Sequence, residues 1–203
     1  MIKKKRVAAL CKSYKYLIMQ TNSDNTQWIG TGAAMYILAG IEPMSAESLA
    51  SMLDYTEKDF AGITFSEHHI ADELFAEEND SDVQIESPPK RVIIENSEYL
   101  IFETGTKLIF INGEYLKPIV VDDQTTYFMR NVPGTTSIAL CVKKGFLPEA
   151  IIRGVNFDEK ALNSWFDDLG KIINAVTCKY IAHLDKEEDE YGEQLGLEDN
   201  DDD

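Results

Sequence analysis

Residues 91–121 decide the fold, and they read RVIIENSEYLIFETGTKLIFINGEYLKPIVV. Short runs rich in β-branched and aromatic residues alternate there with turn-forming dipeptides, and the runs cover residues 92–94, 99–102, 108–111 and 115–121. The dipeptide Asn112-Gly113 is the strongest short hairpin signal in the chain. Because such tight turns join antiparallel neighbours, the stretch predicts an antiparallel β-meander.

The same pattern continues on both sides of this stretch. Downstream, two strands are predicted around the turn Pro133-Gly134, and upstream the turn formers at 22–25 predict a first hairpin. These additional strands are predicted at 15–21, 27–38, 125–130 and 137–142. Gly30 and Gly32 lie inside one of them, where they indicate a bulge or a close approach of backbones.

Helical spacing of apolar residues predicts helices over 5–14, 45–54 and 158–176. Ser45 and Asp158 are expected to cap the second and third of these helices. The third has the widest apolar face, formed by Leu162, Trp165, Phe166, Leu169, Ile172, Ile173 and Val176. A final strand is predicted at 177–184. Helices set apart from a run of antiparallel strands indicate an α+β fold, with a long antiparallel β-meander and two or three amphipathic helices.

The chain has 203 residues, 44% of them hydrophobic, which suits one compact core. We therefore predict a single α+β domain over residues 1–184. Within it, residues 66–90 hold eight acidic side chains and Pro88-Pro89, and they are predicted to form an acidic surface excursion. Residues 185–203 have eleven acidic residues against Lys186 alone, and they are predicted to form a disordered acidic tail.

Charge is distributed unevenly along the chain, whose formal net charge is −17. The first fifteen residues contain no acid and six cations, which are Lys3, Lys4, Lys5, Arg6, Lys12 and Lys15. On a helix Lys5, Lys12 and Lys15 lie near one edge, opposite an apolar face formed by Val7, Leu10, Cys11 and Tyr14, and Lys4 and Arg6 flank that edge. The apolar face can then pack while the cations meet phosphates. We predict that the six cations bind DNA without sequence preference. The alternative is a plain solvated terminus.

Cysteine content and hydropathy bear on the location of the protein. The three cysteines are widely spaced and odd in number, which favours reduced thiols in a cytoplasm over a disulfide framework. No apolar run approaches the roughly 18 to 20 residues that a membrane-spanning helix needs, so no membrane partner is expected.

The sequence predicts no catalytic residue, no bound metal and no cofactor. His68-His69 is the one candidate constellation, with Asp72 and Glu73 at i,i+4 if the segment is helical. The pair lacks the spacing of a His-Glu-x-x-His motif, so a polar surface turn is the preferred interpretation. The glycines at 30 and 32 also fail as a dinucleotide loop, because no helix opens after them.

Residues 27–38, QWIGTGAAMYIL, are followed by Gly40, Ile41, Pro43 and a helix that begins at a serine. This segment resembles uncharacterised proteins encoded by phages and prophages of Gram-positive bacteria, over about the first 55 residues. The resemblance implies a phage setting in a bacterial host cell.

Residues 31–35 and 110–116 are similar in character to segments of DNA sliding clamps. A clamp encircles DNA with several such domains, so this resemblance implies that a chain of this length forms a homo-oligomer.

Together these features predict a non-enzymatic accessory protein of phage DNA replication or recombination. It would contact DNA through the basic N-terminal helix and a protein partner through the acidic tail. A second hypothesis is an acidic inhibitor or DNA mimic that occupies a host DNA-processing protein. A third is a metal-dependent enzyme around His68 and His69.

Overall fold

The computed structural model describes residues 2–155, apart from 69, 95, 105 and 106, together with residues 167, 171 and 174. The chain divides into two compact units, Met1–Val155 and Asn156–Asp203. In the second unit Asp167, Lys171 and Asn174 are helical and exposed. The rest of the helix predicted at 158–176, the strand at 177–184 and the acidic tail lie outside the described residues.

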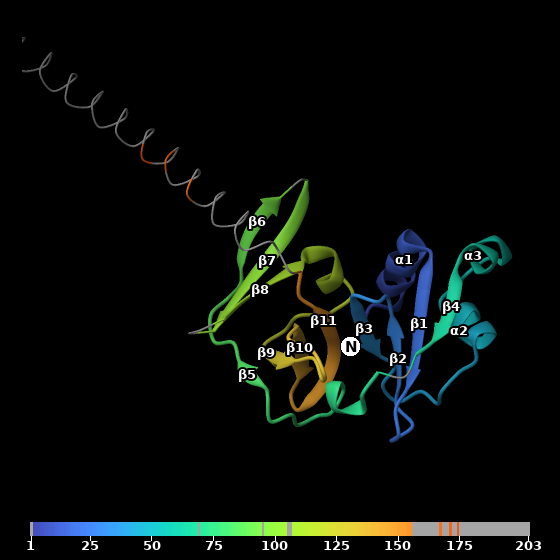
Figure 1. Ribbon diagram of the computed structural model, residues 1–203. Coiled ribbons are helices and arrows are strands. Elements are labelled where there is room, and N and C mark those ends of the chain that lie inside the picture. The colour runs from blue at the N-terminus through green and yellow to red at the C-terminus, as the bar shows by residue number, and fades with distance from the viewer. Residues whose placement is uncertain are drawn as a thin grey trace, which may run out of the picture. The chain divides into compact units, whose positions relative to one another are not determined.

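The first unit is built on an eight-stranded sheet with the strand order β4-β1-β2-β3-β11-β10-β9-β5 (Figure 1). All neighbours in it are antiparallel except β1 and β4, which pair in parallel. The strands are β1 (Tyr16–Thr21), β2 (Gln27–Gly30), β3 (Ala34–Ile37), β4 (Thr64–Glu67), β5 (Val83–Gln84), β9 (Thr125–Asn131), β10 (Ile138–Lys144) and β11 (Leu147–Arg153).

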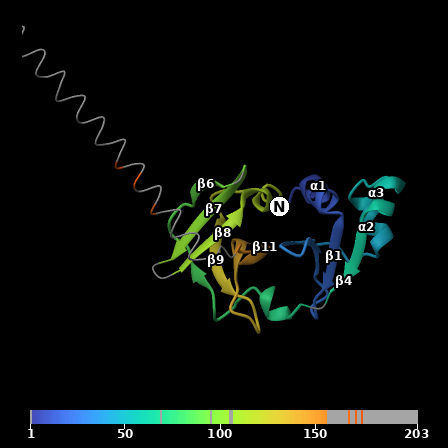
Figure 2. The ribbon, with the colours of Figure 1, turned by 45° about the horizontal axis from the view of Figure 1, so that its top comes forward.

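A second, three-stranded sheet and several short helices complete this unit, and the α+β prediction is confirmed. The sheet is antiparallel, in the order β6 (Lys90–Ile94), β7 (Ser97–Thr104) and β8 (Lys107–Asn112). The helices are α1 (Lys4–Tyr14), α2 (Ala46–Met52) and α3 (Glu57–Gly62), with 3-10 turns η1 (Asp72–Leu74) and η2 (Gly113–Leu116). Figure 2 shows α2 and α3 beside β1 and β4, on the opposite side of α1 from the small sheet.

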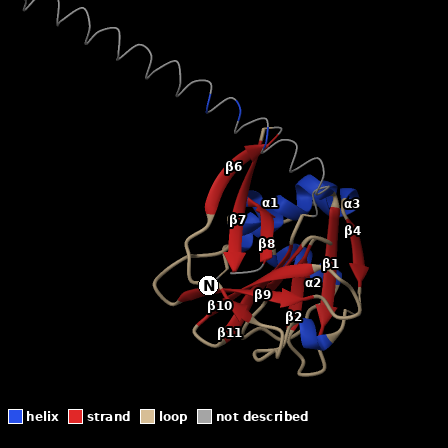
Figure 3. Cartoon of the chain, turned by 60° about the vertical axis from the view of Figure 1, so that its left-hand side comes forward, coloured by secondary structure: helices blue, strands red, loops and turns tan. Residues whose placement is uncertain are grey.

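Both faces of the large sheet are buried, and its strands contribute side chains to both. In β1, Leu17 and Met19 join one core while Ile18 joins the other, and β10 divides its side chains in the same way. The first core lies under α1, α2, η2 and the small sheet. Figure 3 shows α1 and α2 lying against the strands. Burial on both faces explains why β1, β3 and β10 contain nearly continuous apolar runs.

The second core is covered by part of the acidic excursion. Leu74 and Phe75 are 6% and 4% exposed, and they pack against Trp28, whose ring centroid lies 4.7 Å from that of Phe75. Most of the neighbouring acidic side chains stay at the surface. The segment 70–77 is therefore a lid over the sheet.

Two buried glutamines fasten loops to the sheet. The Gln20 amide donates to the carbonyl oxygen of Ile70 (2.9 Å) and accepts from its backbone N–H (2.7 Å). The Gln27 amide makes the same pair of bonds to Met44, at 2.9 and 3.1 Å. Each glutamine side chain thus pairs with the loop backbone as a neighbouring strand would. It thereby satisfies a backbone N–H and a carbonyl oxygen that would otherwise be unpaired.

The structure corrects several details of the predicted meander. Asn112-Gly113 forms no hairpin. The Asn112 side chain accepts a hydrogen bond from the backbone N–H of Glu114 (3.0 Å) and caps η2. Because η2 begins the segment predicted as a strand at 115–121, that prediction is wrong. The strand predicted at 27–38 is two strands joined by a tight turn. The structure adds α3, β4 and β11, which the sequence pattern did not indicate.

Candidate nucleic-acid interface

The helix α1 confirms the predicted amphipathic helix at the N-terminus. Val7, Ala8, Leu10 and Cys11 are buried at helical spacing in the first core. The start of the helix is fixed by the residues before it: the backbone N–H of Lys3 donates to the carbonyl oxygen of Pro118 (2.7 Å), and Ile2 forms a β-bridge with Ile119. The basic segment is therefore attached to the body of the protein at a defined position.

The structure brings four of the six predicted DNA-binding residues together at this helix start. Lys3, Lys4, Lys5 and Arg6 are all exposed. Within the described part of the chain, none of the four side chains forms an ion pair. We name these four residues the basic cluster.

The position of the basic cluster opposes helix stability. The first turn of α1 contains no acidic residue, and the N-cap Lys3 makes no side-chain capping bond. A cation beside the positive end of the helix dipole destabilises a helix by about 0.3–1 kcal/mol. The helix dipole and the four side chains add to one local positive potential, which an anion such as a backbone phosphate would complement.

Lys12, in contrast, is engaged inside the protein. Its ammonium lies 2.8 Å from the Asp59 carboxylate and 5.0 Å from the centre of the Tyr55 ring. Hydrogen bonds from Lys12 and from Thr56 lower the pKa of the Asp59 carboxyl to about 2. Lys12 therefore joins α1 to α3, and its charge is already balanced.

Lys15 lies apart from the basic cluster, at the other end of the helix. It is exposed and has a left-handed backbone (φ 54°), and it ends α1. A helix of eleven residues is about 16 Å long, which places Lys15 about that far from Lys4 along the helix axis.

One cation near the basic cluster was missed by the sequence pattern. Lys117 directly precedes Pro118, the residue that accepts the hydrogen bond from Lys3. Its half-exposed ammonium is paired with Glu114 one turn earlier in η2. More than a hundred residues separate it from the helix, so no local motif could reveal its place.

The thiol and the tyrosine hydroxyls buried at α1 are uncharged at ordinary pH. The Tyr14 hydroxyl lies 2.7 Å from that of Tyr115, and the Tyr36 hydroxyl donates to the Tyr115 carbonyl oxygen, also at 2.7 Å. Burial raises the pKa of both Tyr36 and Tyr115, and it raises the pKa of the Cys11 thiol to about 12. The electrostatic character of the interface thus comes from its surface cations.

The remaining candidates from the sequence are the pair His68-His69 and the glycines at 30 and 32. His68 follows β4 in an extended segment, and its Nε2 lies 3.1 Å from the Tyr16 hydroxyl, while His69 lies outside the described residues. Among the residues described, no group of three or more His, Cys, Asp or Glu side chains could hold a metal ion. Gly30 and Gly32 lie at the β2–β3 turn, where Thr31 and Ala34 exchange two backbone hydrogen bonds.

Across the described ranges, no helix has the length and apolar character needed to cross a membrane. Comparisons of the chain with family models, curated proteins and solved structures found no match.

Proposed function

We propose that this chain is a non-enzymatic accessory protein of phage or prophage DNA replication or recombination. In this proposal the basic cluster contacts the sugar–phosphate backbone of DNA in the bacterial cytoplasm, and copies of the chain associate as in a sliding clamp. The acidic tail is proposed to meet a protein partner.

The observation that carries the proposal is the basic cluster itself. Four consecutive cations are exposed at the start of a helix whose following turns are buried. This is the end at which cations destabilise a helix most. Selection for solubility alone would not place them there. Contact with phosphates gives them a role, and backbone contacts need no base-reading side chains.

The net charge of −17 does not prevent such contact. The Debye length is about 8 Å at physiological ionic strength, so a phosphate at the helix start experiences mainly the nearby cations. The same net charge supports the second candidate function, an acidic inhibitor or DNA mimic. In that case phosphate would be repelled and the acidic surface would face a basic host protein.

The test compares DNA binding of the wild type with a variant in which Lys3, Lys4, Lys5 and Arg6 are all replaced by glutamine. Labelled duplex and labelled single-stranded DNA are titrated at several salt concentrations. We expect the variant to bind all sequences more weakly. The slope of log affinity against log salt should be flatter by roughly 0.7 to 0.9 for each phosphate that the variant no longer neutralises.

The matched control replaces four exposed cations elsewhere, Lys58, Lys90, Arg91 and Arg153, with glutamine. It changes the net charge by the same amount but leaves the basic cluster intact, so it should retain the wild-type slope. If the wild type binds neither DNA even at low salt, the DNA-contacting proposal is wrong and the acidic-inhibitor hypothesis takes its place.

A further inference from the structure

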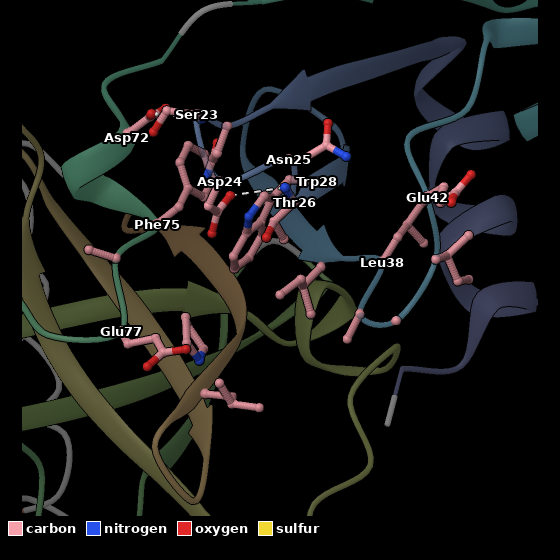
Figure 4. Close-up of a pocket in the computed structure, with 18 residues that line it drawn as sticks. Ser23, Asp24, Asn25, Thr26, Trp28, Leu38, Glu42, Asp72, Phe75 and Glu77 are labelled. Atoms are coloured by element: carbon pink, nitrogen blue, oxygen red, sulfur yellow. Dashed lines mark hydrogen bonds between the residues drawn. The ribbon is translucent and has the colours of Figure 1, made fainter.

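A surface pocket formed by the β1–β2 turn, the segment after β3 and the lid is lined by acids. Its volume is about 570 Å³, and within the described residues no Lys, Arg or His side chain belongs to its lining. Carboxylates contributed by three separate segments surround it (Figure 4); they belong to Asp24, Glu42, Asp72 and Glu77. We name it the acidic pocket.

Two of these carboxylates are engaged with nearby backbone, and two are open to solvent. Asp24 accepts the backbone N–H of Thr26 (2.9 Å), and Asp72 accepts that of Ser23 (3.0 Å). Glu42 and Glu77 are exposed, and their carboxylates form no ion pair with the described residues. Lys143 reaches the carbonyl oxygen of Glu77, but its ammonium is paired with Asp82. The acidic pocket therefore has a net negative charge.

A buried donor in the pocket wall lacks a partner. Trp28 is 1% exposed, and its indole Nε1–H has no hydrogen-bond acceptor among the described residues. In the view of Figure 4 the indole projects among the lining side chains, beside Asp24. A buried N–H without an acceptor is unfavourable, so an oxygen atom brought by a ligand would relieve it.

Apolar side chains adjoin the pocket at the β10–β11 turn. Leu147 lines the pocket and is 53% exposed, and its neighbour Phe146 is 88% exposed, the highest value among the large apolar side chains described. Leu147 thus gives the pocket an apolar edge beside its carboxylates.

We infer that this pocket binds a peptide segment of a partner protein that carries a lysine or arginine side chain. The negative charge of the pocket, to which Glu42 and Glu77 contribute from opposite sides, attracts the cation (Figure 4). A backbone carbonyl oxygen of the peptide accepts the Trp28 N–H, and an apolar neighbour packs on Leu147. A peptide supplies all three groups together, whereas a small polyamine supplies only the cation. This inference is independent of DNA binding by the basic cluster.

The test follows the indole N–H signal of Trp28 by NMR in the full ¹⁵N-labelled chain. The variant Trp165→Phe identifies that signal, because the sequence has two tryptophans. The probe is an acetylated, amidated Leu-Arg-Leu-Arg peptide, and the control peptide has neutral citrulline in place of each arginine. We expect a saturable shift of the Trp28 signal with the arginine peptide only.

The variant Glu42→Gln/Glu77→Gln should weaken this binding about five- to tenfold, because two of the four carboxylates that make the pocket negative are removed. The control Glu57→Gln/Asp123→Asn makes the same charge change outside the pocket and should bind as the wild type does. Binding of the peptide that leaves the Trp28 signal in place would locate it outside the pocket and overturn the inference. An equal shift with the citrulline peptide or with spermidine would overturn it as well.

Discussion

Arg130 and Asp82 form a bidentate ion pair, with Nε donating to Oδ1 and an Nη donating to Oδ2, both at 2.7 Å. The Arg130 side chain is fully buried, and that of Asp82 is 10% exposed. The other Nη of Arg130 donates to the carbonyl oxygens of Leu74 and Ala76, each at 2.8 Å. The pair thereby fixes the lid segment on the sheet, and with it the side of the acidic pocket formed by Phe75 and Glu77.

Replacing Asp82 with asparagine should destabilise the protein by about 3–5 kcal/mol, because it leaves a buried guanidinium without a counter-charge. Lys143, which also donates to Asp82 (2.8 Å), loses its partner as well. Urea unfolding of the full chain measures the change. The control is Asp80→Asn, an exposed neighbour, which should change the free energy of unfolding by less than about 0.5 kcal/mol. Equal effects of the two substitutions would contradict the role given to the pair.

The pair also predicts a dependence of stability on pH. Burial raises the pKa of Asp82, but hydrogen bonds from Arg130 and Lys143 outweigh burial and hold the pKa below its ordinary value of 3.8. A lowered folded-state pKa means that the stabilisation is complete above the unfolded-state pKa and is lost as the pH falls through the folded-state value. The stability difference between wild type and Asp82→Asn should therefore be constant near neutral pH and shrink below about pH 4. A constant difference down to about pH 2 would argue against this linkage.

The class of fold could be predicted from sequence because apolar periodicity reports burial directly. The helix α1 and the strands β1, β7 and β10 all follow from local pattern. Pairing could not be predicted in the same way. The parallel contact of β4 with β1 joins residues 64–67 to 16–19, and four residues with partly exposed side chains carry no periodic signal for it. Asn112 illustrates a local failure, since its side chain caps η2 where the dipeptide rule predicts a turn.

The candidate site was predictable only in part for the same reason. The run of four cations from Lys3 to Arg6 is visible in a single sequence, because consecutive charged residues at a helix start are rarely buried. The neutralisation of Lys12 does not, because its partner Asp59 is 47 residues away and lies on a helix that the pattern did not indicate. The acidic pocket combines segments around residues 24, 42 and 75, and only the three-dimensional fold places them together.

Replacing Gly30 with alanine should destabilise the β2–β3 hairpin. A Cβ atom at this position would lie 1.9 Å from the carbonyl oxygen of Ala34, so backbone must move, at a cost of about 1–3 kcal/mol or more. Thermal unfolding measures this. Gly62→Ala is the control, since a Cβ there meets no atom within 4 Å. That substitution should be neutral or stabilising by up to about 1 kcal/mol. Tolerance of alanine at residue 30 would show that the turn is looser than described.

Cys11 and Cys141 should resist alkylation in the folded protein. Both are 0% exposed, and burial raises the pKa of their thiols to about 12 and about 11. Iodoacetamide reacts with the thiolate, so at about pH 8 both should be modified only after denaturation. Peptide mass spectrometry distinguishes the individual cysteines. Rapid modification of Cys11 under native conditions would mean that α1 opens readily from the sheet.

The basic cluster is tested most directly by lysine footprinting with and without DNA at low salt. Acetylation by a water-soluble reagent is followed by mass spectrometry at single residues, with Lys58 and Lys90 as exposed lysines outside the cluster. We predict that DNA slows acetylation of Lys3, Lys4 and Lys5 several-fold while Lys58 and Lys90 react at unchanged rates. Equal rates at all five lysines in the presence of excess DNA would contradict the proposal that this helix start is where DNA binds.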